Sequence, residues 1–174
     1  SSIPAGQALA FENPISSQAV QTRLGANSAL LGTAMAGARI VAVGLRGLII
    51  YSDDAGASWK QASVPTQSDL VAVSFPTAKK GWAVGHGGVV LHSADAGATW
   101  ARQLDGVKAA ELAVNHYQAS SAPDAAALLE REKSLQAAGG TQPLLDVYFE
   151  SEKTGFVVGT FNRIFRTADG GKSW

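Results

Sequence analysis

Apolar positions along the chain recur in short runs that are separated by glycine-rich turns. Within residues 70–100 the runs are Leu70–Phe75, Gly81–Gly85 and Val89–His92, and a fourth run starts at Thr99. Runs of this length, bounded by Gly, Asp and Ser, predict β-strands joined by tight turns. The second and third runs contain "WAV" and "VVL", so these strands are expected to be buried on both faces.

The same strand pattern is repeated three times. Residues 70–100 align without gaps with residues 144–174, and residues 30–59 fit after one deletion. Ser93 follows Ser52 by 41 residues, and a period of about 40 to 45 residues with several short strands per unit is typical of β-propeller blades. We therefore predict an all-β fold with three propeller blades. The predicted blades cover approximately residues 30–65, 70–106 and 144–174.

Each unit contains the same eight-residue motif between its third and fourth strands. The motif reads SDDAGASW, SADAGATW and TADGGKSW in the three units. Its Asp can accept hydrogen bonds from its own turn, its Gly can take a positive φ, and its Trp can pack against neighbouring strands. A catalytic acid would not need to be repeated in every unit, so we predict a structural role. The residues concerned are Ser52, Asp54, Gly56, Trp59, Ser93, Asp95, Gly97, Trp100, Thr167, Asp169, Gly171 and Trp174.

The motif resembles the Asp box, also called the BNR repeat, of β-propellers. The longer unit, L-x-x-V-x-F, then G-[WF]-x-V-G, then [ST]-x-D-x-G-x-[ST]-W, is similar to that of the photosystem II stability/assembly factor family. The chain resembles a bacterial relative of that family over residues 30–106 and 144–174. The resemblance implies a seven-bladed propeller, exported to the periplasm or the thylakoid lumen, that acts as an assembly or interaction factor.

Three units cannot close a ring. We therefore expect residues 30–174 to be a partial propeller, the N-terminal part of a longer protein. Residues 1–29 have little periodicity and are expected to form an N-terminal arm.

An insertion separates the second unit from the third. Only 10 residues lie between the first two units, whereas 43 residues lie between the second and the third. The alanine-rich stretch Val107–Gln118 predicts one helix. Ser121 is a suitable N-cap for a second helix, which Gly139 and Gly140 would end. We predict a helical hairpin at about 107–140, which could either cover the propeller edge or contact a partner.

The turns of a blade alternate between its two ends because its strands are antiparallel. Turns between second and third strands therefore lie opposite the Asp boxes, on the same face as the helical insertion. Loops carried on a rigid scaffold are common binding sites. The candidate partner-binding residues on this face are Arg46, His86, Phe161 and Arg163.

Composition excludes several classes of function. The chain has 14 basic and 14 acidic residues, whereas nucleic-acid binders normally have a basic excess. It has no cysteine, which excludes disulfides and thiolate metal sites. The apolar stretch 29–51 contains two arginines, each costing about 2.5–3.5 kcal/mol near the centre of a membrane helix. His86 and His92 have no evident third ligand, so no metal or other cofactor is expected.

These observations together predict a non-enzymatic scaffold. The family resemblance further implies that it binds a protein partner, a subunit of a membrane complex, and assists the assembly or stability of that complex. The alternative is a carbohydrate-active propeller, because sialidases carry the same boxes. Sialidase chemistry needs an arginine cluster, a Tyr nucleophile with its Glu partner, and an Asp acid. None of the arginines stands in a recognisable sialidase context.

Overall fold

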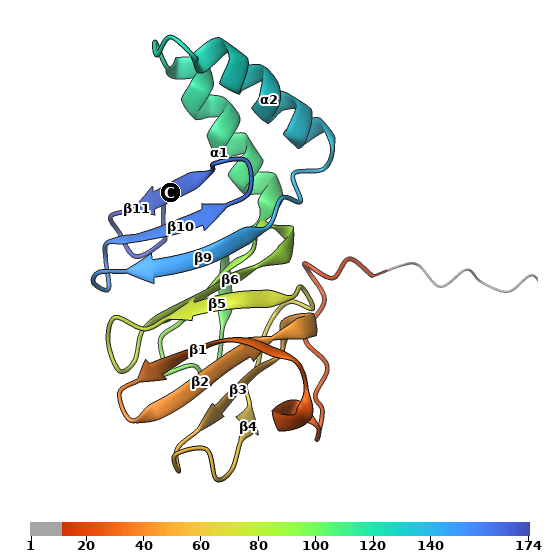
Figure 1. The fold of residues 1–174 in the computed structure, drawn as a ribbon, viewed down its shortest axis with the longest axis vertical. Helices are drawn as coiled ribbons and strands as arrows, with labels where there is room; N and C mark the ends of the chain where they lie inside the picture. The colour runs from red at the N-terminus through yellow and green to blue at the C-terminus, as the bar shows by residue number, and fades with distance from the viewer. Residues whose placement is uncertain (1–11) are drawn as a thin grey trace, which may run out of the picture.

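The computed structural model describes residues 12–174, which form three antiparallel sheets and two helices (Figure 1). Residues 1–11, part of the predicted N-terminal arm, lie outside the described residues. The first sheet contains β1 (Leu30–Ala36), β2 (Arg39–Gly44), β3 (Ile49–Ser52) and β4 (Lys60–Gln61). The second contains β5 (Leu70–Ser74), β6 (Gly81–Gly85), β7 (Val90–Ser93) and β8 (Ala101–Leu104). The third contains β9 (Leu144–Phe149), β10 (Gly155–Gly159) and β11 (Ile164–Thr167).

The sheets are arranged as consecutive propeller blades. Within each sheet the strands follow the order of the chain, and each strand pairs antiparallel with the next. The first strands β1, β5 and β9 lie next to one another across the three sheets (Figure 1). The predicted antiparallel β-structure is therefore present, and the apolar stretch 29–51 forms strands β1 to β3. Among the described residues, no helix is long and apolar enough to cross a membrane.

Apolar side chains of each blade pack against the following blade. Between the first and second blades, Val41 and Ile49 are fully buried in a cluster with Leu91. Between the second and third blades, the ring of Trp82 stacks on that of Phe149 with 3.6 Å between centroids and 7° between planes. The first and third blades cover the second blade on both sides. This explains why its strands are apolar on both faces, as the sequence predicted.

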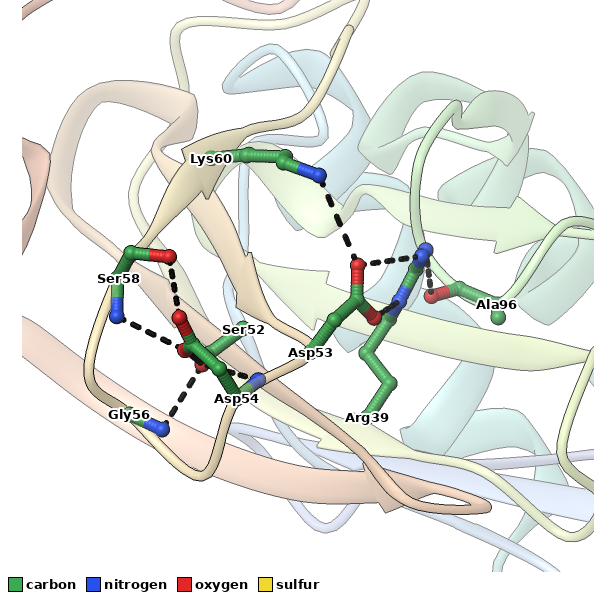
Figure 2. Close-up of polar contacts among 8 residues, drawn as sticks. All are labelled: Arg39, Ser52, Asp53, Asp54, Gly56, Ser58, Lys60 and Ala96. Atoms are coloured by element: carbon green, nitrogen blue, oxygen red, sulfur yellow. Dashed lines mark hydrogen bonds and ion pairs between the residues drawn. The ribbon is translucent and has the colours of Figure 1, made fainter.

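A charged side chain also links each pair of blades. Arg39 pairs with Asp53 of its own blade at 2.7 Å, and its Nη1 donates to the carbonyl of Ala96 in the second blade at 3.3 Å (Figure 2). Lys80 occupies the equivalent position one repeat later. Its Nζ lies 2.7 Å from Oε2 of Glu152 in the third blade. The repeat therefore places one positively charged side chain between each pair of neighbouring blades, at the end of the blades that carries the Asp boxes.

The insertion forms α1 (Gly106–Ala119) and α2 (Ala125–Ala137). Helix α1 starts just after β8, and the side chain of Asp105 caps it by accepting a hydrogen bond from the Lys108 backbone N–H at 3.1 Å. Ala109 and Ala113 of α1 are buried in the same cluster as Trp82. The first helix therefore belongs to the core between the second and third blades.

The predicted N-cap of the second helix is wrong. Helix α2 starts after Asp124, which makes no capping hydrogen bond through its side chain. The preceding turn is closed when the backbone N–H of Ala125 donates to the carbonyl of Ala122 at 3.0 Å. The hydroxyl of Ser120 accepts from the backbone N–H of Ala122 at 3.2 Å. Ser121 is exposed in this turn and lies outside the helix.

The described part of the arm, residues 12–29, follows the outer edge of the first blade. The backbone N–H of Ala19 donates to the carbonyl of Val64 at 2.9 Å. The side chain of Gln61 accepts from the Thr22 N–H at 2.8 Å and donates to the Val20 carbonyl at 2.9 Å. The arm then crosses onto the face of the first blade that points away from the second.

Candidate functional site

The Asp boxes close their turns through one shared set of hydrogen bonds. In the first box, the Ser52 hydroxyl donates to Oδ1 of Asp54 at 2.7 Å and accepts from the Gly56 N–H at 2.8 Å (Figure 2). The backbone N–H and the hydroxyl of Ser58 donate to the same carboxylate at 2.8 and 2.6 Å. The second and third boxes repeat these contacts. Residue types that could form a catalytic site are here used to close turns.

These hydrogen bonds keep the box carboxylates ionised. The hydroxyl and N–H of Ser58 lower the pKa of Asp54 to about 2, and those of Ser173 do the same for Asp169. Burial opposes the shift at Asp95, but hydrogen bonds from Thr99 still lower its pKa. A carboxylate that already accepts several hydrogen bonds and stays ionised is poorly suited to act as a general acid near neutral pH.

The glycine and tryptophan of each box also serve the fold. Gly56, Gly97 and Gly171 have φ of 92°, 85° and 81°, in the region that favours glycine. Trp100 is buried and donates from Nε1 to the carbonyl of Gly97 at 3.0 Å. Trp59 and Trp174 are half-buried. The boxes also contact the preceding blade, because a Cβ added at Gly97 would lie 3.1 Å from Cγ2 of Val41.

On the opposite face, the structure brings two of the predicted partner-binding residues together around one carboxylate. Arg46 lies in the turn η2 (Leu45–Gly47) and His86 in η3 (His86–Gly88). Oδ1 of Asp69 accepts from the backbone N–H of Arg46 at 2.8 Å, and its Oδ2 lies 3.7 Å from Nδ1 of His86. The side chains of Arg46 and His86 are exposed.

Phe161 lies in the corresponding turn of the third blade. Its side chain is 52% exposed, and its φ is 60°. An exposed aromatic ring at a strained turn position adds nothing to the core. The side chain is therefore free to contact a partner.

The fourth predicted residue, Arg163, is buried, so the prediction that it lies on the exposed partner-binding face is wrong. Only 6% of Arg163 is exposed, and its Nε donates to Oε2 of Glu132 in α2 at 2.9 Å. Its Nη1 donates to the side-chain oxygen of Gln142 at 3.2 Å. Glu132 is fully buried and also accepts from Arg131 at 2.9 Å. Arg163 is therefore an internal ion-pair partner that holds the helical hairpin, and it does not belong to an exposed partner-binding face.

Sequence reasoning missed Glu132, although one signal was present. Leu128, Glu132 and Leu135 lie four and three residues apart, on one face of a helix. A charge within an otherwise apolar stripe indicates a buried pair, but nothing in the local sequence names its partner. Among the described residues, no group of three or more His, Asp or Glu side chains could hold a metal ion.

Three consecutive antiparallel blades with Asp boxes define the chain as a β-propeller-type protein. The sequence model of the family described as "Photosynthesis system II assembly factor YCF48" matches residues 16–117. The chain belongs to this family.

Solved structures agree with this assignment at the level of the fold. A structure described as "YCF48 bound to D1 peptide" matches with a TM-score of 0.57 at 17% identity, covering 99% of this chain and 45% of that chain. YCF48 from Cyanidioschyzon merolae matches with a TM-score of 0.57 at 21% identity, covering 84% of this chain and 39% of that chain. The chain thus spans less than half the length of either structure. No curated protein matches the chain.

Proposed function

We propose that this chain forms three blades of an Asp-box propeller that has seven blades when complete. The complete protein acts as a non-enzymatic scaffold, which binds a protein partner and assists the assembly or stability of a membrane complex. The observation that carries the proposal is family membership over residues 16–117. The domain division that we propose is an arm at 1–29, blades at about 30–65, 70–106 and 144–174, and a helical insertion at about 107–140.

The proposed partner is a peptide segment of a membrane-complex subunit. One structural relative is described as bound to a D1 peptide, and we extend peptide binding of this kind to the present chain. The exposed side chains of Arg46, His86 and Phe161 on one face support a binding role for the turns. We further propose that the protein works outside the cytoplasm, in the periplasm or the thylakoid lumen.

The pairing of two arginines weakens the glycosidase alternative. A sialidase-like site needs several free guanidinium groups for the carboxylate of its substrate. Arg39 is paired with Asp53, and Arg163 is paired with Glu132. Both guanidinium groups are therefore already committed to carboxylates of the protein itself.

The packing of α1 and α2 supports the interpretation that the insertion covers the propeller edge. The buried alanines of α1 lie in the core between the second and third blades, and Arg163 pairs with a buried carboxylate of α2. Removing the hairpin would expose that core and leave Arg163 without its partner. A test of partner binding should therefore leave the hairpin in place.

A crosslinking pull-down from the native membrane fraction tests the proposed function. The full chain is compared with a double variant carrying His86→Ser and Phe161→Gly, and with a control carrying Lys172→Gln on the box side. We expect one membrane-complex subunit to be enriched by the full chain and by the control, and to be lost with the double variant. If no such subunit is enriched by any form, the scaffold proposal fails. Hydrolysis of a fluorogenic sialoside panel would overturn the non-enzymatic assignment.

A further inference from the structure

The N-terminal arm lies across the junction between the first and second blades, at the end where each blade has its turn between second and third strands. Ala19 packs against Gly47 of η2, and Ile15 packs against Gly87 of η3. A Cβ added at Gly87 would lie 2.8 Å from Cδ1 of Ile15, so the glycine leaves room for this side chain. Both blades of the junction are present in the chain, so closure of a ring places no further blade between them.

The blades hold this part of the arm through its backbone carbonyls. The Pro14 carbonyl accepts from the Gln67 N–H at 2.7 Å and from the Thr66 hydroxyl at 3.0 Å. Nη1 of Arg102, on β8, donates to the Ile15 carbonyl at 2.6 Å. The side chain of Ile15 packs against the core cluster of the junction. Carbonyl hydrogen bonds combined with an apolar side chain in a pocket are the contacts by which proteins bind extended peptides.

The arm has little buried surface to keep it in place. Of residues 12–24, Ala19 is buried, Ile15 and Ser17 are half-buried, and the others are exposed. Segments with few buried apolar contacts and exposed backbone hydrogen bonds open at a lower free energy than core strands do. The arm is therefore expected to leave the junction while the blades stay folded.

We propose that the site holding Pro14 and Ile15 is a peptide-binding site, which the arm occupies until a segment of the partner displaces it. The partner segment is extended and uncharged, with an aliphatic side chain directly after a proline, because it replaces the same carbonyl contacts and fills the space over Gly87. His86, one of the residues proposed to contact the partner, directly precedes Gly87 in the chain. The inference rests on the proposed function, because it specifies where the peptide partner binds and how access to that site is regulated.

The test uses a fluorescein-labelled, amidated peptide with the sequence of residues 13–19, Asn-Pro-Ile-Ser-Ser-Gln-Ala. Its binding to the native chain and to Ile15→Gly is measured by fluorescence anisotropy. In the native chain the tethered arm competes at a high effective concentration, whereas Ile15→Gly weakens the arm and leaves the site intact. We expect the variant to bind the peptide about tenfold more tightly, because the competing arm has lost its apolar contact.

Two controls accompany this measurement. Arg23→Gln changes an exposed side chain of the arm and should bind the peptide as weakly as the native chain does. A peptide with glycine in place of isoleucine should not bind. Adding Arg102→Met to Ile15→Gly removes the donor to the peptide carbonyl, so affinity should fall about tenfold.

Hydrogen exchange of the native chain tests release of the arm without any variant. The Gln67 N–H is protected by the Pro14 carbonyl, so it should exchange by local opening, faster than the amides of β6. Equal protection of Gln67 and β6 would mean that the arm leaves only when the protein unfolds, and the inference would fail.

The peptide measurement has its own contrary outcomes. The inference is overturned if the peptide does not bind Ile15→Gly, binds it no more tightly than the native chain, or is unaffected by Arg102→Met. A native dimer that Ile15→Gly dissociates would also overturn it, by showing that arms are exchanged between copies. In the pull-down, excess peptide should reduce capture of the membrane-complex subunit by Ile15→Gly. Unchanged capture would place the partner elsewhere, and the proposed function would then stand without this site.

Discussion

Arg163→Leu removes the positive partner of a carboxylate that is fully buried between α2 and the third blade. In the native protein Oε2 of Glu132 accepts from Arg163 at 2.9 Å, and Oε1 accepts from Arg131 at 2.9 Å. Breaking a buried ion pair by removing one partner costs roughly 3–5 kcal/mol, because the remaining charge stays buried. Arg131 still pairs with one oxygen in the variant, so we expect a loss of about 3 kcal/mol, at the lower end of this range.

Denaturation by urea, followed by tryptophan fluorescence, measures this loss. A second variant, carrying both Glu132→Leu and Arg163→Leu, should recover most of it, because replacing a whole buried pair with apolar side chains is often neutral. Lys133→Met on the same helix is the matched control. Lys133 forms an exposed ion pair with Glu130 at 2.9 Å, and exposed pairs contribute only about 0–1 kcal/mol.

The result that would refute the reasoning is a loss in Arg163→Leu no larger than the loss in Lys133→Met. The Glu132 carboxylate would then be hydrated in solution, and the hairpin would not be fixed to the third blade. An equal loss in the single and double variants would instead show that side-chain packing, and not charge, causes the effect.

Three further predictions concern the junctions and the boxes. Trp82→Ala should lower the free energy of unfolding by about 3–5 kcal/mol, and a change below about 1 kcal/mol in urea denaturation would contradict the stacking on Phe149. Asp169 has a pKa of about 2, below its usual 3.8; the unfolded chain takes up protons first as the pH falls, so stability should be lost between about pH 4 and pH 2. In an acid titration followed by circular dichroism, Asp169→Asn should lose less stability over this pH range than the native protein. Burial and the charge of Lys80 lower the pKa of His92, so its contribution to stability is present above the usual value of 6.5 and is lost as the pH falls below it. Histidine NMR titration should place the midpoint of His92 below that of a free histidine.

The sequence was most informative where structure depends on local spacing. The Asp and the Ser or Thr of each box bond to groups within four residues, so the motif contains most of what its turn requires. The strands were predicted for the same reason, because an apolar run and its turn lie close together in the chain. The alanine-rich helix was also predicted as an element.

Contacts between distant residues could not be predicted in the same way. Glu132 and Arg163 are 31 residues apart, and either residue alone is typical of an exposed surface. The alanines of α1 indicated a helix, but small apolar side chains do not reveal how deeply a helix is buried. The contacts of the arm with the first blade, such as the hydrogen bond from the Ala19 N–H to the Val64 carbonyl, also join residues that are far apart in the chain.

The arm also makes the two ends of the blade series unlike each other. Blades associate head to tail, since the face that contacts the next blade differs from the face that contacts the previous one, and such heterologous contacts can continue without limit unless something closes or blocks them. On the first blade the arm covers part of the face that a previous blade would contact: Gly25 packs against Ile50, which is 1% exposed. On the third blade Ile164, the counterpart of the buried Val90, is 69% exposed. In a closed ring the last blade would pack on this same face of the first blade, so closure has to include the arm in that junction or move it aside.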